Sequence, residues 1–360
     1  MNSLVTMLRV VTPTGRSASR MRHGAERQTR HSDAERRNKI AWLKQPASHG
    51  FPKPAIMHSM PIYDLCLAWN WDYDADFARL LEAACAAHDM ALLQIHPSNL
   101  EAARSAIEMG ETRFRCLLDR AADTDARFQS LVDRAQAQGI PLVNPPERSR
   151  RAWDKATMHL EFLSRGLETP HTLILPPYRE QPGFPLPDLS PLRGRFAIKP
   201  AIGGGGEGVV LEASTWEQVG AARQQFPAEK YLLQAHVSPR SLDQRPAWFR
   251  VLYCNGAVYP CWWDQSTHGY VRVTAEERSR FGLRELYETP RRIAALCGLH
   301  LFSTEIALTD AGQFSVVDYV NDPLDLRLQS KAADGVPDAI VENIASRLAR
   351  LAGSFPKNPV

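Results

Sequence analysis

The segment that decides the fold runs from residue 196 to residue 211 and reads Phe196-Ala-Ile-Lys199-Pro-Ala-Ile-Gly203-Gly-Gly-Gly-Glu-Gly208-Val-Val-Leu211. Apolar residues on both sides of the glycines predict two strands, residues 195–199 and 209–211, joined by a glycine loop. The G-x-G-x-x-G spacing of a dinucleotide site is present, but that fingerprint requires a helix after the loop. A Walker loop is excluded because no Gly-Lys-Ser/Thr follows the glycines.

A strand, a lysine, a glycine loop and a second strand form a pattern suited to phosphate groups. Glycines lack a Cβ atom, so backbone N–H groups in the loop can approach phosphate oxygens closely. Lys199 supplies a point charge for the same oxygens. The alternative is a surface hairpin without a ligand, but four consecutive glycines lose much entropy on ordering and gain no packing in return. The candidate phosphate-binding residues are Lys199, Gly203, Gly204, Gly205, Gly206, Glu207 and Gly208.

Upstream of this segment, strands and helices alternate. Strands are expected at residues 62–69, 90–95, 114–118 and 140–143, with helices at 74–88, 99–109 and 125–138 between them. This βαβαβαβ order predicts a small parallel sheet flanked by helices over residues 61–150. Pro145-Pro146 ends that region.

Downstream, the pattern changes to helices mixed with hairpins. The hairpin signals are Asn255-Gly256 between strands 249–253 and 257–263, and Asp310 to Gly312 between strands 302–308 and 313–320. Further strands are expected at 172–175 and 231–234. The expected helices span residues 151–165, 215–225, 290–297 and 337–351.

Several of these motifs, in this order, resemble the ATP-grasp superfamily, to which D-alanine–D-alanine ligase, glutathione synthetase and biotin carboxylase belong. Trp153-Asp154-Lys155, a helix and then Gly166 to Pro170 resemble the family's entry motif, which makes Lys155 the first phosphate lysine and Lys199 the second. The resemblance covers residues 61–352. It implies a fold of class α/β and α+β: a small parallel pre-ATP-grasp sheet domain at 61–150, then two α+β lobes at 151–352 that clamp ATP, with a lid lobe at about 170–237.

The resemblance also assigns the nucleotide and the transferred phosphate. Gln234, Ala235, His236 and Val237 resemble the hinge that meets adenine through backbone groups, although the family usually has an acidic residue where Ala235 stands. Asp243 is a candidate acceptor for the ribose hydroxyls. Arg250, in Trp248-Phe249-Arg250-Val251, matches the arginine that the family directs at the transferring phosphate, where positive charge helps phosphoryl transfer.

A metal site is implied on the last hairpin. Glu305 on its first strand and Asp318 and Asn321 on its second resemble the residues that hold two Mg²⁺ ions between ATP phosphates, and Mn²⁺ is an alternative ion. The usual spacing is acid-x-Asn, and this chain has one residue more. Strict alternation would place Asn321 on the opposite face from Asp318, unless a bulge, a strand end or a turn at Val320–Asn321 intervenes. Asp322 is the competing ligand.

The charge distribution separates residues 1–60 from the rest. The whole chain carries a net charge of +3, whereas residues 1–60 carry 11 basic and 3 acidic residues, so the remainder is net negative. Little apolar periodicity accompanies the arginines, and we expect a disordered tail. A nucleic-acid-binding arm and a transit-like peptide are the alternatives. No run approaches the ~18 apolar residues of a transmembrane helix, and six scattered cysteines form no metal or disulfide pattern.

The resemblance implies an enzyme that joins a carboxylate to an amine through an acyl phosphate and releases ADP and phosphate. The scattered cysteines, expected to be reduced and buried, favour a cytoplasmic protein. Its partners would be ATP and small-molecule or peptide carboxylates and amines, without a membrane or nucleic acid; a homodimer is left open. The alternatives are a kinase that phosphorylates a hydroxyl and a nucleotide-binding regulator without turnover.

The aromatic clusters at residues 69–72 and 262–264, which include Trp262 and Trp263, are expected to pack in the core. The first cluster ends a parallel strand, where open sheets place ligands, so contact with the substrate is its alternative role. Arg327 is a candidate partner for a substrate carboxylate.

Overall fold

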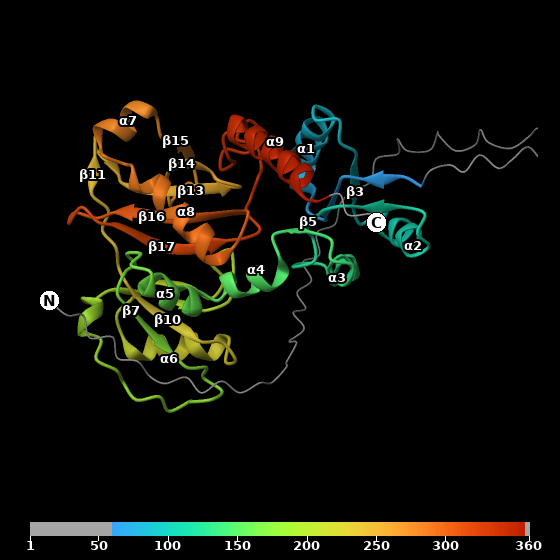
Figure 1. The fold of residues 1–360 in the computed structure, drawn as a ribbon. Coiled ribbons are helices and arrows are strands. Elements are labelled where there is room, and N and C mark those ends of the chain that lie inside the picture. Colours follow the sequence, from blue (N-terminus) through green and yellow to red (C-terminus); the bar gives the residue numbers. More distant parts are fainter. Residues whose placement is uncertain (1–59, 357–360) are drawn as a thin grey trace, which may run out of the picture. The chain divides into compact units, whose positions relative to one another are not determined.

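The computed structural model describes residues 60–356, and the predicted basic tail lies outside them except for Met60. Its first region is a four-stranded parallel sheet, as the alternation of strands and helices predicts, and its strands lie in the order β3-β2-β5-β6 (Figure 1). The strands are β2 (Leu65–Trp69), β3 (Leu92–Ile95), β5 (Leu117–Arg120) and β6 (Leu142–Val143), and the connecting helices are α1 (Ala75–Ala86), α2 (Leu100–Glu108) and α3 (Gln129–Ala137).

Two predicted strands of this region are each broken in two. The segments β1 (Ile62–Tyr63) and β4 (Arg113–Phe114) pair with each other outside the main sheet. The break falls at Asp64, whose carboxylate accepts hydrogen bonds from the Ala91 N–H at 3.0 Å and from Arg115 at 2.8 Å. These side-chain bonds replace ladder bonds, so the expected continuous strands at 62–69 and 114–118 are wrong in detail.

The predicted helix at 151–165 is two helices. The first, α4 (Pro146–Trp153), begins with a proline at its first turn, and the second is α5 (Lys155–Ser164). Asp154 between them has extended backbone and caps α5, accepting from the N–H groups of Ala156 and Thr157. An aspartate satisfies the free N–H groups of a helix start, so it favours a new helix over continuation of the old one.

A four-stranded antiparallel sheet follows, in the order β7-β10-β8-β9. One face packs on the helix α6 (Trp216–Gln225), which starts with a capping box between Thr215 and Gln218. The glycine segment connects β8 to β9 as predicted. The strands are β7 (Thr172–Leu175), β8 (Phe196–Pro200), β9 (Val210–Ala213) and β10 (Tyr231–Ala235).

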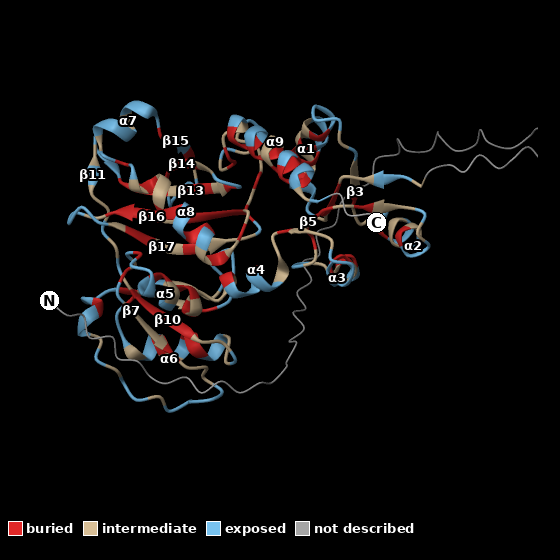
Figure 2. Ribbon diagram, in the orientation of Figure 1, coloured by how far each residue is buried: buried red, intermediate tan, exposed pale blue. Residues whose placement is uncertain are grey.

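The last region is a five-stranded antiparallel sheet in the order β15-β14-β13-β16-β17. Residues of β13 and β16 pack into two hydrophobic cores. One core includes α8 and the other includes α9, so a helix covers each face of the sheet. Figure 2 shows the buried residues along these strands. The strands are β13 (Trp248–Cys254), β14 (Ala257–Trp263), β15 (Tyr270–Arg272), β16 (Leu301–Leu308) and β17 (Phe314–Asn321), and β11 (Ser241–Leu242) and β12 (Arg245–Pro246) pair separately.

Three helices complete this region. The helix α8 (Glu285–Cys297) begins five residues before the predicted start. Pro290, expected to be its first residue, lies in its interior. The short α7 (Ala275–Arg280) was not predicted, and a Thr274–Glu277 capping box starts it. The final α9 (Asp338–Ser354) packs against α1 as well as β13. No helix among residues 60–356 is long and apolar enough to cross a membrane.

Candidate active site

Lys199 connects the four-stranded sheet to the strand that carries Asp318. Its side chain leaves β8 and Nζ donates to Oε1 of Gln234 at 2.8 Å and to the backbone carbonyl of Val317 on β17 at 3.3 Å. Gln234 in turn donates from Nε2 to the Tyr319 hydroxyl at 3.1 Å. The lysine is therefore held by defined partners, one of which is the residue before Asp318.

Lys155 lies at the start of the glycine segment. It is the first residue of α5, and its Nζ donates to the carbonyl of Gly203 at 2.6 Å. Its position is fixed by Asp154, which caps α5 and also pairs with Lys230, next to β10, at 2.6 Å. The cap thus anchors the beginning of α5 to the sheet that carries Lys199.

The glycine segment has a backbone that requires glycine at several positions. Gly205, Gly206 and Gly208 have φ values of 61°, 77° and 71°, in the left-handed region that other residues disfavour. Residues 202–207 are exposed, whereas a Cβ atom at Gly208 would lie 2.5 Å from Cε2 of Phe226. The segment therefore offers exposed backbone N–H groups on a loop whose downstream end is packed.

Arg250 and the two predicted metal acids lie next to one another on the five-stranded sheet. Arg250 is the register partner of Glu305, which is the register partner of Asp318. Nη1 of Arg250 lies 3.3 Å from Oε1 of Glu305, while Oε2 accepts from the indole N–H of Trp248 at 3.2 Å. The arginine also donates to Ser303 and lies over the ring of Trp263.

The bulge that the predicted metal site needs is present. Between the pairs Ser303–Asn321 and Glu305–Asp318, β17 has one residue more than β16, and a second irregularity follows between Glu305 and Ile306. These shifts place Asp318 and Asn321 on the face of Glu305. The amide nitrogen of Asn321 is close enough to lower the pKa of Asp318 but, among the described residues, has no partner in hydrogen-bonding geometry.

The electrostatics of this group favour a bound cation. Burial and the neighbouring Asp318 raise the pKa of Glu305, whereas Lys199 and Lys155 bring the pKa of Asp318 below its ordinary value in spite of burial. Desolvation also lowers the pKa of Lys199, against the pull of the two acids. Two neighbouring carboxylates in a desolvated place repel each other. Arg250 and Lys199 already offset part of this repulsion, and a bound cation would offset more of it.

The donor set fits Mg²⁺ that is shared with another ligand. Glu305, Asp318 and Asn321 offer hard oxygen atoms, the type that Mg²⁺ prefers. Within residues 60–356, no group of three or more His, Cys, Asp and Glu side chains could hold a metal alone. Such a site needs further oxygens, and Mg²⁺ usually takes them from waters and substrate phosphates.

The predicted hinge consists of the last two residues of β10, Gln234 and Ala235, and the two residues that follow it. The side chain of Gln234 is only 2% exposed and is committed to Lys199 and Tyr319, so it supports the lysine. The N–H of Ala235 donates to the His171 carbonyl at 2.8 Å, which leaves the N–H groups of His236 and Val237 as the candidates for adenine.

The side chains of three other candidate site residues already have partners in the structure. Asp243 forms a two-point ion pair with Arg280, which occupies the oxygens that ribose would need. Asp322 accepts from Ser149 at 2.5 Å, and burial raises its pKa to about 6, so it belongs to a different group from Asp318. Arg327 is bound by Asp325 and Asp334, both at 2.7 Å, which leaves little capacity for a substrate carboxylate.

Sequence reasoning did not find the polar groups that position the site. Trp248 bonds Glu305, Asp154 pairs with Lys230, and Gln234 connects Lys199 to Tyr319, yet each pair is distant in sequence and matches no motif. Only Asp154 carried a usable signal, since an aspartate before a helical segment is a typical cap. The tryptophans Trp262 and Trp263 are buried, as the expected packing role requires.

Comparison with known proteins gives matches of structure alone. No protein-family model and no curated protein sequence matches the chain. The structure is similar to that of a RimK-domain ATP-grasp protein from Sphaerobacter thermophilus, with a TM-score of 0.54 and 18% identity over 80% of this chain and 100% of the other.

Two further structures extend this similarity. D-alanine–D-alanine ligase from Bacillus anthracis, complexed with ATP, has a TM-score of 0.54 and 13% identity over 80% of this chain and 98% of the other. The ATP-grasp ligase PsnB, complexed with a minimal precursor, Mg and ADP, has a TM-score of 0.51 and 13% identity over 81% and 97%. The arrangement of sheets that the resemblance implied is confirmed: this chain has the ATP-grasp fold.

Proposed function

We propose that this protein is an ATP-dependent ligase that joins a carboxylate to an amine through an acyl phosphate. The observation that carries the proposal is the convergence of two lysines on two carboxylates. Lys199 and Lys155 both lower the pKa of Asp318, which lies opposite Glu305 beside Arg250. Lysines, an arginine and paired acids are the parts that phosphoryl transfer needs for positioning and charge stabilisation.

In the proposed reaction, a carboxylate oxygen attacks the γ-phosphorus of ATP and the bond to ADP breaks. The amine then attacks the acyl carbon, phosphate leaves, and the amine loses a proton. Lys155, Lys199 and the N–H groups of residues 203–208 would bind the phosphates. Arg250 would stabilise the charge of the transferring group, and its contacts with Glu305 and Trp263 keep its guanidinium oriented.

Mg²⁺, bound by Glu305, Asp318 and Asn321, would neutralise phosphate charge, and Mn²⁺ would be an adequate substitute. We expect two Mg²⁺ ions, because two carboxylates and the phosphate oxygens of ATP would serve as ligands. His236 and Val237 would contact the adenine through their backbone groups. These assignments are supported by structurally similar ligases, of which D-alanine–D-alanine ligase is complexed with ATP and PsnB with Mg and ADP. D-alanine–D-alanine ligase and the complex of PsnB with a precursor peptide likewise support a small-molecule or peptide substrate.

An ADP-release screen tests the proposal. The protein is incubated with ATP, Mg²⁺ and pairs of candidate substrates drawn from amino acids, short peptides and hydroxy acids. The masses of the products are measured by mass spectrometry. The proposal expects ADP release that requires both partners and a product equal to their sum minus water. A phosphorylated hydroxyl instead, or no ADP release with any pair, would contradict it.

A pair of lysine variants connects the activity to the site. Lys199→Ala should lower the rate of ADP release by roughly 10²–10³-fold, because it removes a charge from the developing phosphoryl group. Lys331→Ala is the matched control, since Lys331 is exposed and its side chain forms no hydrogen bond or ion pair among the described residues. Equal rates in the two variants would remove Lys199 from the mechanism.

A further inference from the structure

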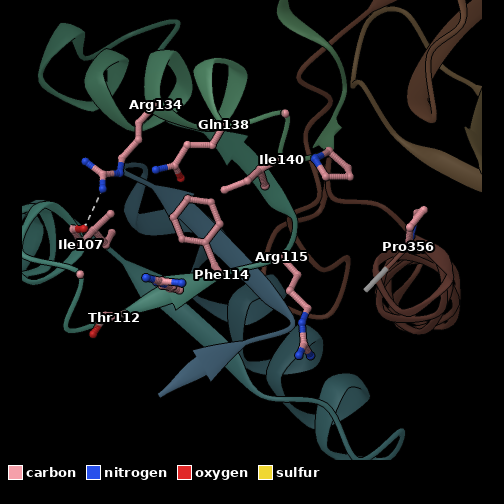
Figure 3. A pocket seen from close by; sticks show the side chains of 12 residues that line it. Ile107, Thr112, Phe114, Arg115, Arg134, Gln138, Ile140 and Pro356 are labelled. Carbon is pink, nitrogen blue, oxygen red and sulfur yellow. Dashed lines mark hydrogen bonds between the residues drawn. The ribbon is translucent and has the colours of Figure 1, made fainter. Parts of the chain in front are cut away.

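Apart from the candidate active site, the described residues include a cavity of about 410 Å³ at the amino ends of β5 and β6 (Figure 3). It contains three arginines, but Arg134 donates to the Ile107 carbonyl at the end of α2 and Arg115 pairs with Asp64. Two of its three cations thus have structural partners, and this edge of a parallel sheet is the one away from the usual ligand site. We therefore assign no ligand to this cavity.

A chain of hydrogen bonds connects Lys199 to the helix α5. Nζ of Lys199 lies 2.8 Å from Oε1 of Gln234, and Nε2 of Gln234 lies 3.1 Å from the hydroxyl oxygen of Tyr319. The same hydroxyl lies 2.8 Å from Nδ1 of His159. Gln234, Tyr319 and His159 are each at most 3% exposed, so solvent does not reach this part of the chain.

The lysine determines the direction of every bond in this chain. An ammonium group only donates, so the amide oxygen of Gln234 faces Lys199 and the amide nitrogen faces Tyr319. That nitrogen donates to the Tyr319 oxygen, which leaves the hydroxyl proton for Nδ1 of His159. Nδ1 therefore carries no proton, and the single proton of the neutral ring is on Nε2. The Thr169 hydroxyl, 3.4 Å from Nδ1, is a second donor to it.

The surroundings of His159 keep the ring neutral, as this direction requires. Burial and the neighbouring His171 lower the pKa of His159 to about 4, so the ring has one proton at neutral pH. A charged ring would carry donors on both nitrogens and would leave the Tyr319 proton without this acceptor. The chain of bonds is thus complete with the neutral ring.

The chain also limits what Lys199 offers to a ligand. An ammonium group has three N–H donors. Among the described residues, Gln234 accepts from one of them and the Val317 carbonyl, at 3.3 Å, accepts from another. One N–H remains for a phosphate oxygen, and the two fixed partners orient it before the ligand binds.

We propose that Tyr319 and His159 are positioning residues for Lys199 and that they act through Gln234. His159, with its proton on Nε2, accepts from Tyr319, and Tyr319 accepts from Gln234, which holds the lysine in the orientation that binds phosphate. The role of Lys199 in this inference rests on the proposed ligase function.

Tyr319→Phe tests the positioning role, because it keeps the ring and removes the hydroxyl. With the substrate pair that the ADP-release screen identifies, kcat should fall about tenfold or more, with a smaller change in the KM for ATP. Tyr231→Phe is the matched control, since Tyr231 is also buried and its hydroxyl donates to the Ala222 carbonyl at 2.6 Å, outside the chain. Equal kcat values in the two variants would overturn the proposal.

Two substitutions of His159 separate the hydrogen bond from packing. His159→Asn keeps an acceptor close to the place of Nδ1, whereas His159→Leu fills the space without an acceptor. The kcat should fall about tenfold or more in His159→Leu and should be largely restored in His159→Asn. An equal loss in both variants, or no loss in His159→Leu, would contradict the positioning role.

Nitrogen-15 NMR of histidine-labelled protein tests the chain without any activity, and the loss of a signal in His159→Asn assigns His159. We expect the ring proton on Nε2. A proton on Nδ1, which would follow if Tyr319 donated to the neighbouring Thr172 hydroxyl, would overturn the chain.

The two measurements distinguish this inference from the proposed function. No ADP release with any substrate pair, together with a proton on Nε2, would support the chain and reject the ligase alone. Normal ADP release by both wild type and Tyr319→Phe would reject the positioning role alone.

Discussion

At the scale of single residues, the site is built by pairing each charge with a partner from another element. Lys199 on β8 reaches a carbonyl of β17, Arg250 on β13 reaches Glu305 on β16, and Trp248 supports the same carboxylate. Each fixed partner reduces the rotamer freedom of a catalytic candidate before a ligand arrives. We therefore expect conservative substitutions of these residues to lower the rate of ADP release more than the free energy of unfolding.

Arg250→Lys is the substitution that tests this expectation. Lysine keeps the charge but loses the planar fork that contacts Ser303 and Glu305 together. The rate of ADP release should fall about tenfold to hundredfold, with a smaller change in the Kd of ATP with Mg²⁺. Arg272→Lys, at an exposed position of β15, is the control, and an unchanged rate in Arg250→Lys would contradict the assigned role.

His159 gives a pH-dependent prediction. Burial lowers the pKa of His159 to about 4, and its Nδ1 lies 2.8 Å from the Tyr319 hydroxyl. Its unfolded-state pKa is about 6.5, so the unfolded chain binds more protons between these values. The stability that neutral His159 contributes is complete above about pH 6.5 and is lost as the pH falls towards 4.

His159→Asn should remove this dependence. From about pH 7 to about pH 5, the wild type should lose roughly 2 kcal/mol more of its free energy of unfolding than the variant, measured by urea denaturation. Asp119 and Asp322, whose pKa values are raised to about 6, act in the opposite direction but are present in both proteins. Parallel pH profiles for wild type and variant would show that His159 titrates normally.

At the scale of elements, sequence patterns predicted the type of most helices and strands but not their interruptions. The glycine loop, both hairpins and the parallel sheet follow from local turn chemistry and periodicity. The break at Asp64 depends on Arg115 and Ala91, and the start of α8 lies before Pro290 because its apolar residues pack on the sheet. Such contacts join residues that are distant in sequence, so local sequence patterns do not predict them.

The end of the glycine loop yields a prediction about an element. Gly208→Ala should lower the free energy of unfolding by on the order of 1–3 kcal/mol, since the new methyl meets Phe226 and φ is 71°. Gly204→Ala is the matched control, because its φ is not positive and nothing lies within 4 Å of an added Cβ. Urea denaturation measures the free energy of unfolding of both variants. Equal values would mean that the close packing of residue 208 against Phe226 does not require glycine.

At the scale of the molecule, one core connects the parallel sheet to the five-stranded sheet through α1 and α9. The buried pair of Arg120 and Asp74 lies in the same region and also holds the carbonyl of Leu324 after β17. The resemblance predicted the ATP-grasp fold, and a bulge was one of the features by which Asn321 could share a face with Asp318. The metal-binding role of these residues stays a prediction. The resemblance could not predict Arg120 with Asp74, because the pairing joins residues 46 positions apart without a motif.

Removing one partner of this pair should affect the whole described fold. Asp74→Ala leaves a buried guanidinium without its carboxylate and should cost about 3–5 kcal/mol of the free energy of unfolding. Asp76→Ala removes a carboxylate that pairs with the exposed Arg79, which should cost about 0–1 kcal/mol. Urea denaturation of both compares them directly, and a loss below about 1 kcal/mol for Asp74→Ala would show that the pair is not structural.

The central claim is that Asp318 and its neighbours bind the phosphates of ATP through Mg²⁺. Isothermal titration of a non-hydrolysable ATP analogue, with Mg²⁺ and with EDTA, tests it most directly in wild type and Asp318→Asn. We predict wild-type binding that is about tenfold or more tighter with Mg²⁺, and little effect of Mg²⁺ on Asp318→Asn. Wild-type binding that is absent or independent of Mg²⁺, or an Asp318→Asn variant that keeps the full Mg²⁺ effect, would contradict the claim.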